Sequence, residues 1–221
     1  MNSQHNKEQN PIQQTSDASA EPINKGYLQS QLLIAMPGLD DPYFKKSVTL
    51  ICQHDENGCF GLTINKPMEI SFDEIFKQLN IETKDDNSHQ PSESDSSQHS
   101  NKPSSVIRGG PVQAEQGFVI HDSQKQWENT MLIDEALAVT ASSDILIDIA
   151  AGKGPENYLL ALGCASWTAG QIESEIMENS WLNCPIDKDI LFEMPFAQRW
   201  QGAADTLGIN LHSMSGASGH D

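Results

Sequence analysis

Short apolar runs separated by turn-forming residues set the pattern of the first third of the chain. Leu32–Met36, Ser47–Gln53 and Cys59–Asn65 each have this form, which is typical of a buried strand bounded by turns. Asp55–Gly58, between the second and third runs, has the composition of a hairpin turn. The pattern therefore predicts one strand followed by a β-hairpin.

Helical periodicity enters after these strands. Ser71 and Glu74 have the spacing of a capping box before apolar positions three and four apart. Further helical signals are a helix capped by Ser142 or Ser143 that runs through Ala151 and stops at Gly152, a second capping box formed by Thr168 and Gln171, a turn capped by Asp187, and a helix that Pro195 starts and Gly208 closes. Gly117–His121 and Tyr158–Leu162 read as strands, the second breaking at Gly163. Hairpins followed by mixed strand and helix units predict an α+β fold with a mixed sheet.

Two polar segments divide this pattern. Residues 1–25 are rich in Gln, Asn, Ser and Glu, and residues 83–105 contain no apolar side chain except Pro. Such segments bury too little surface to offset the entropy lost on ordering, so we predict that both are disordered. The expected organisation is a disordered arm over 1–25, a single domain over 26–215 interrupted by the insert 83–105, and a tail over 216–221.

The chain is strongly acidic, with 31 Asp and Glu against 13 Lys and Arg and a formal net charge of −18. Binding to nucleic acid phosphates needs clustered cations, and only Lys45 and Lys46 are adjacent. A nucleic acid partner is therefore disfavoured, and a protein partner or a small anionic ligand is favoured. No signal peptide or membrane-length apolar run is apparent, and four cysteines without a Cys-x-x-Cys pair are typical of reduced thiols. These features predict a cytoplasmic protein without membrane association.

Several familiar chemistries find no support in the sequence. The glycine-rich fingerprints of nucleotide binding are missing, so no cofactor is predicted. Cys52, His54 and Cys59 flank the hairpin turn but fall short of the four ligands of a zinc site, so no metal is predicted. Ser166 lacks the flanking glycines of a nucleophile elbow. No catalytic residue is assigned.

A candidate ligand-binding surface remains at the turns that follow the strands. Two glycines in Arg108–Pro111 could form an anion-binding nest or a structural turn that needs positive φ. Lys66 and Arg108 could share a rim and hold an anion. The alternative is that the Asn65 side chain satisfies a turn and that Lys66 is solvated. The hypothesis assigns ligand binding to eight residues: Asn65, Lys66, Arg108, Gly109, Gly110, His121, Trp167 and Gln171. Tryptophans such as Trp167 are more often core or helix-packing residues than ligand stackers.

Motifs spread over residues 30–220 resemble the AlgH/YqgE family of bacterial proteins, whose biochemical activity is not established. They are Ala35–Pro37, Asp41–Phe44, Gly61–Pro67, Arg108–Val112, Gly117–His121, Gly163–Gln171, Glu175, Asn179, Trp181–Leu182, Arg199–Trp200, Leu207–Ile209 and Ser215–His220. The resemblance implies a bifurcated mixed sheet, partly barrel-like, surrounded by helices. It also implies the label of transcriptional regulator, which fits poorly with the acidic charge.

Three functions stay open at this point. The first is a non-catalytic binding protein that acts on regulation indirectly. The second is an enzyme or ligand-binding protein for an anionic metabolite, with Lys66 and Arg108 holding the anion and His121 acting as acid or base. The third is a direct transcriptional regulator, which the net charge of −18 disfavours.

Overall fold

Ten strands form the framework of the molecule in the computed structural model, which describes residues 27–83, 105–122 and 125–214. The strands are β1 (Gln31–Ala35), β2 (Val48–Asp55), β3 (Gly58–Thr63), β4 (Pro67–Ser71), β5 (Ser105–Arg108), β6 (Val112–His121), β7 (Thr130–Asp134), β8 (Leu137–Thr140), β9 (Tyr158–Thr168) and β10 (Trp181–Pro185). They follow the order β10-β1-β2-β3-β9-β6-β8-β7, with β4 and β5 off this path. The predictions of disorder for 1–25 and for most of 83–105, and the predicted tail over 216–221, lie outside the described residues.

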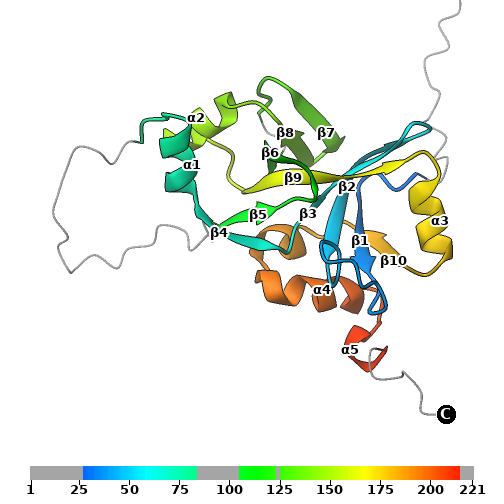
Figure 1. The fold of residues 1–221 in the computed structure, drawn as a ribbon. Coiled ribbons are helices and arrows are strands. Elements are labelled where there is room, and N and C mark those ends of the chain that lie inside the picture. Colours follow the sequence, from blue (N-terminus) through cyan, green and yellow to red (C-terminus); the bar gives the residue numbers. More distant parts are fainter. Residues whose placement is uncertain (1–26, 84–104, 123–124, 215–221) are drawn as a thin grey trace, which may run out of the picture.

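The sheet branches along β9, its longest strand. The first part of β9 pairs with β6 and, in parallel, with β5, whereas Ala165–Thr168 pairs with β3. The other strand pairs are antiparallel, so the sheet is mixed. Figure 1 shows β9 running between the two groups of strands. The predicted α+β fold with a mixed, bifurcated sheet is therefore confirmed.

The segment before β1 brings the two ends of the curled sheet together. Gln29 Nε2 donates to the carbonyl of Ile133 at 3.2 Å, and Ser30 Oγ donates to Asp134 at 2.8 Å. Both acceptors lie on β7, the strand at the opposite end of the sheet order from β1 and β10. These bonds give the sheet its partly barrel-like form, as expected.

Helices cover the sheet on three sides, each over a separate hydrophobic cluster. They are α1 (Phe72–Gln78), α2 (Asp144–Ala150), α3 (Gln171–Met177), the π-helix η1 (Asp189–Glu193), α4 (Phe196–Asp205) and α5 (Leu211–Met214). The inner cluster packs against η1, α4 and α5, a second cluster packs against α3, and a third packs against α1 and α2. Figure 1 shows these three groups of helices on different sides of the sheet. None of the described helices is long and apolar enough to span a bilayer.

Two local expectations were wrong. The strand that begins at Tyr158 does not break at Gly163 but bends there, because this glycine adopts φ of +73° and pairing resumes after it. The helix expected to begin at Thr168 begins at Gln171, although the Gln171 side chain still accepts from the Thr168 amide at 3.0 Å. By contrast, the capping box of Ser71 and Glu74 is formed as predicted at α1.

Candidate functional site

The eight residues of the predicted ligand-binding surface lie along the length of β9 rather than around one point. Arg108 pairs with Leu162 near the middle of the strand, and its amide donates to the carbonyl of Lys66 at 2.8 Å. His121 pairs with Tyr158, four residues away, or about 13 Å at the rise of a strand. Trp167 lies in the opposite direction, up to about 16 Å from Leu162. Lys66 and Arg108 are brought together by this backbone hydrogen bond, whereas the Lys66 ammonium donates to the carbonyl of Lys45.

Asn65 and Lys66 hold the loop that enters β2. The Asn65 side chain accepts from the Val48 amide and donates to the Lys46 carbonyl, both at 2.8 Å. Lys66 Nζ donates to the carbonyl of Lys45 at 2.6 Å. Burial, and then the charge of Lys46, lowers the pKa of Lys66. The Asn65 side chain therefore has a structural role. The ammonium of Lys66 is half-buried and lies near the charge of Lys46.

Gly109 and Gly110 allow backbones to approach closely and have the backbone conformation of neither alternative, a nest or a turn that needs positive φ. Neither has positive φ. A Cβ at Gly109 would lie 2.2 Å from the Gly163 carbonyl oxygen, and one at Gly110 would lie 2.2 Å from the Cys164 carbonyl. The Gly109 amide donates to Leu162 at 2.8 Å, so this amide is already used within the fold. Both positions are glycine because a Cβ at either one would clash with the backbone of β9, which explains them without a bound anion.

His121 is fully buried and enclosed in a hydrogen-bond network. Its Nδ1 contacts the carbonyl of Asp122, which can only accept, so Nδ1 carries the proton and Nε2 accepts from Thr140 Oγ1 at 2.8 Å. Burial lowers the pKa of His121, which favours this neutral form. Thr140 Oγ1 also lies 2.7 Å from Thr130 Oγ1. The arrangement resembles an activated hydroxyl, but both His121 and Thr140 are fully buried, so the network holds β6, β7 and β8 together.

Trp167 and Gln171 belong to a packed aromatic cluster beneath α3. The indoles of Trp167 and Trp181 both donate to Glu175 Oε2, at 3.0 and 2.8 Å. Gln171 Nε2 donates to the other oxygen of Glu175 at 2.9 Å. These contacts support the reading of Trp167 as a core residue. Ligand binding by any of the eight residues stays a prediction.

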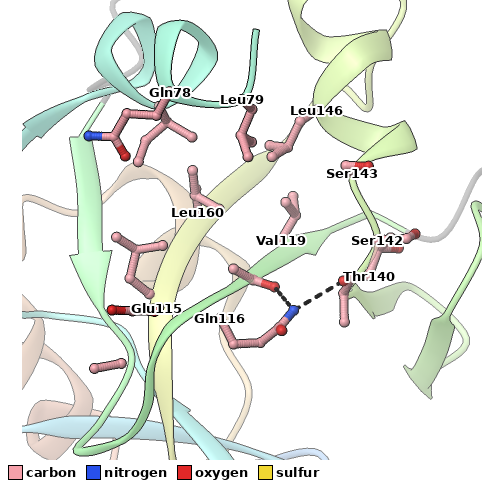
Figure 2. Close-up of a pocket in the computed structure, with 15 residues that line it drawn as sticks. Gln78, Leu79, Glu115, Gln116, Val119, Thr140, Ser142, Ser143, Leu146 and Leu160 are labelled. Carbon is pink, nitrogen blue, oxygen red and sulfur yellow. Dashed lines mark hydrogen bonds between the residues drawn. The ribbon is translucent and has the colours of Figure 1, made fainter. Parts of the chain in front are cut away.

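A cleft lies elsewhere, between α1, α2 and β6. This cleft has a volume of about 550 Å³, within the range of small-molecule sites. Val119, Leu146, Leu160 and Leu162 form an apolar floor, and amides, hydroxyls and Glu115 form the rim. In Figure 2, Leu79, directly after α1, lies above the floor, and Ser142, Ser143 and Leu146 lie on the opposite side. Its lining includes none of the eight predicted residues.

A bulge in β6 builds one wall of this cleft. Val112 pairs with Cys164 and Gly117 with Leu162, so four residues of β6 loop out against one residue of β9. Gln113 within this bulge has φ of +50°. Gln116 fixes the wall, since its Nε2 donates to the carbonyls of Gly117 and Ala141 at 3.2 Å (Figure 2). The backbone passes close to β9 at Gly110 and Gly163, and the bulge begins directly after this close approach. The glycines of the sequence motif therefore help to position the cleft wall without lining the cleft.

The described residues place few ionisable groups in the cleft. Glu115 is the one ionisable side chain among the residues that line it, and the Thr140 hydroxyl at its wall is bonded within the network of His121. The cysteines Cys52, Cys59, Cys164 and Cys184 are free and buried, and burial raises the pKa of each thiol, that of Cys59 to about 12. Among the described residues, no cluster of three or more His, Cys, Asp or Glu could hold a metal ion.

The sequence carries little sign of this cleft. Its floor consists of ordinary core residues, and its rim of Ala114, Gln116 and Ser142 has the composition of any surface loop. The capping box at Ser71 is the one local signal that bears on it, because that helix forms a wall. The long bulge depends on contacts between β6 and β9 and has no signature in a single strand.

Comparisons with known proteins agree with the fold. A family described as AlgH-like matches residues 32–212. A relative from Stenotrophomonas maltophilia is 43% identical over 199 residues, covering 90% of this chain and 99% of its own, and one from Xanthomonas campestris is 45% identical over 194 residues, covering 87% and 96%. Both have the name UPF0301 protein, which states no activity.

Solved structures extend the comparison to the fold. The solution structure of AlgH from Pseudomonas aeruginosa has a TM-score of 0.66 and 38% identity, covering 95% of this chain and all of the other. A Corynebacterium diphtheriae protein of 19% identity has a TM-score of 0.61 over 85% of this chain and 91% of the other, a likeness of fold alone. On the match to 32–212 and these identities, the chain belongs to the AlgH-like family.

Proposed function

We propose that this protein is a non-catalytic binding protein that takes a small ligand with an apolar portion into the cleft between α1, α2 and β6. The observation that carries the proposal is a cleft of about 550 Å³ with a largely apolar lining, in which Leu79 and Leu162 are at least partly exposed, within a rim of amides and hydroxyls. A concave site with an apolar lining and a few polar groups is the usual form of a small-molecule site. Each buried methylene of such a ligand contributes about 0.8 kcal/mol.

Two features favour binding over an enzymatic role. His121, the acid–base residue of the enzyme hypothesis, is enclosed with Thr140 and is out of contact with solvent. The buried thiols have raised pKa values, which makes them poor nucleophiles at neutral pH. The cleft therefore offers recognition without a reactive group.

A regulatory role, if the protein has one, is proposed to be indirect, through a ligand or a protein partner. With a net charge of −18, the chain would be repelled by the phosphates of DNA. The test is an electrophoretic shift assay with duplex DNA at physiological salt, in which we expect free DNA throughout. A shifted band that is lost when Lys45 and Lys46 are replaced by glutamine would contradict the indirect role.

The cleft itself can be tested with decanol, a neutral probe whose alkyl chain suits the apolar floor. We expect saturable shifts of the amide resonances of Leu79, Gly117 and Leu146 when decanol is titrated into ¹⁵N-labelled protein. Ala114→Trp should abolish the shifts, because Ala114 is exposed at the cleft wall. Ala169→Trp is the matched control, since Ala169 is exposed beyond the far end of β9. Shifts that are absent, or equally lost in both variants, would contradict the proposed function.

A further inference from the structure

The described side chains that line the cleft between α1, α2 and β6 carry one formal charge, and that charge is negative. Glu115, exposed on the bulge of β6, is the one ionisable group among them. Lys77 adjoins a lining residue in sequence and Arg108 pairs with another, but neither cation lines the cleft. A charged group of a ligand in the cleft would therefore meet a carboxylate.

The Gln116 side chain adds a hydrogen-bond acceptor on the same bulge. Its Nε2 donates to the carbonyls of Gly117 and Ala141, both at 3.2 Å (Figure 2). A primary amide has two N–H hydrogens, so both are used within the protein. Because the two carbonyls can only accept, they also fix which end of the amide is the nitrogen. The end that remains for a ligand is Oε1, which can only accept.

Ser142, near the start of α2, has also used its hydrogen within the protein. Its Oγ is hydrogen-bonded to the carbonyl of Glu128 and to Oδ1 of Asp144. Both partners are acceptors and a hydroxyl has one hydrogen, so Ser142 can offer a ligand only a lone pair. The partly buried carboxylate of Asp144 also places a second negative charge in contact with this lining residue.

The remaining polar side chains of the lining do not change this balance. The hydroxyl of Thr140 is fully buried and bonded within the fold. Gln78 and Ser143 are exposed, and an amide and a hydroxyl can each turn to accept as well as donate. The lining groups whose hydrogen-bonding sense is fixed are therefore acceptors, which calls for donors on the ligand.

The charge of the whole chain acts in the same direction. The formal net charge is −18, and a concave site lined by one sign of charge concentrates ions of the opposite sign. At the same cleft, Leu79 is 48% exposed and Leu162 is partly exposed. The site therefore combines apolar contact area with a surplus of acceptors and negative charge.

We infer that the ligand of the cleft is an amphipathic cation, whose apolar part contacts Leu79 and Leu162 and whose ammonium group donates hydrogen bonds to Glu115. This inference rests on the proposed function and names the class of ligand. An ammonium has three donors and no acceptor, which matches the lining, whereas a carboxylate would face Glu115. The charge of this ligand is opposite to that expected from Lys66 and Arg108 in the sequence.

The test compares three probes with the same alkyl chain: decylammonium, decanol and decanoate, each titrated below its micellar concentration into ¹⁵N-labelled protein. We expect decylammonium to bind about two- to fivefold more tightly than decanol, the value of an ion pair with an exposed carboxylate. Decanoate should bind less tightly than decanol. Glu115→Gln should make the affinities for decylammonium and decanol equal, because it keeps the size of the side chain and removes its charge.

Glu56→Gln is the control for net charge, since Glu56 is exposed in the turn between β2 and β3, beside the far end of β9. This variant should keep the preference for decylammonium. An equal loss of the preference in both variants would overturn the inference, because the attraction would then come from net charge alone. Decylammonium binding no more tightly than decanol, or less tightly than decanoate, would also overturn it while leaving the proposed function intact. Failure of all three probes to bind would instead contradict the proposed function.

Discussion

The two halves of β9 both carry helices on their outer faces, but the packing beneath those helices differs. Beyond Gly163, α3 covers a cluster in which Phe44 lies 5.9 Å from Trp167 and 5.5 Å from Trp181 between ring centroids. The two indole N–H groups share one oxygen of Glu175. Before Gly163, α1 and α2 cover the strand and leave a cleft of about 550 Å³. The half of β9 beyond Gly163 is fully packed and its indole N–H groups are hydrogen-bonded, whereas the half before Gly163 borders an unfilled cleft.

The difference shows which residues of a motif carry structure and which border a site. Trp167, Glu175 and Trp181 stand together because one carboxylate satisfies two buried indoles, which is a requirement of the fold. At the other half, Leu160 is fully buried in the cluster under α1 and α2, and Leu162, which also lines the cleft, is partly exposed. Incomplete packing of apolar side chains forgoes contact energy, and a site for an apolar ligand is one reason for a fold to retain it.

The largest effect is expected from breaking the filled half. Trp167→Ala should lower the free energy of unfolding by about 3–5 kcal/mol, because it leaves a cavity and removes one donor to Glu175. Leu79→Ala at the mouth of the cleft should cost less than about 1 kcal/mol, because that side chain is already 48% exposed. Urea unfolding followed by circular dichroism measures both. Similar losses in the two variants would contradict the contrast between a packed and an open half.

The glycines at the junction of the two halves provide the next test. Gly110→Ala should destabilise the protein by at least about 2 kcal/mol, since its Cβ would lie 2.2 Å from the Cys164 backbone, and the bulge beyond it should be disturbed. Gly117→Ala is the matched control, because its Cβ would meet only a Leu160 methyl at 3.8 Å. It should leave stability unchanged or raise it by up to about 1 kcal/mol. Thermal unfolding of the pair checks this, and equal melting temperatures would refute the close-packing explanation.

Features held by local interactions could be predicted from the sequence. The hairpin at Asp55–Gly58 and the capping box at Ser71 depend on residues within four positions of each other, and both are formed. The continuation of β9 through Gly163 could not be predicted, because an isolated glycine ordinarily ends an apolar run and only the crossing at Gly110 explains it. β4, β7, β8 and β10 were not predicted either. Their sequences are short, and they form strands because they pair with distant segments of the chain.

For the site, the sequence pointed to two cations on neighbouring segments but did not reveal the cleft. Lys66 and Arg108 both follow strands, and the structure sets them across from each other. His121 and Trp167 were grouped with them because both stand at strand ends, but register places them toward opposite ends of β9. The cleft could not be predicted from the sequence, because one of its walls is a bulge whose length depends on pairing between β6 and β9.

The smallest expected effect concerns the caps of the two helices above the cleft. Ser71 accepts from the Glu74 amide at 3.3 Å and caps α1, whereas Ser143 precedes α2 without a side-chain cap. Ser71→Ala should lower the free energy of unfolding by about 1 kcal/mol, and Ser143→Ala should change it by less than about 0.5 kcal/mol.

The Ser71→Ala and Ser143→Ala variants also test whether a well-formed α1 is needed for the cleft to bind decanol. Loss of the Ser71 cap should also weaken decanol binding, because fraying of the first turn of α1 reaches Ile75 at the cleft wall. Hydrogen exchange of the α1 amides, measured beside the decanol affinity of each variant, separates fraying from a change at the cleft itself. Faster exchange in Ser71→Ala with unchanged affinity would show that the cleft depends on its strands alone.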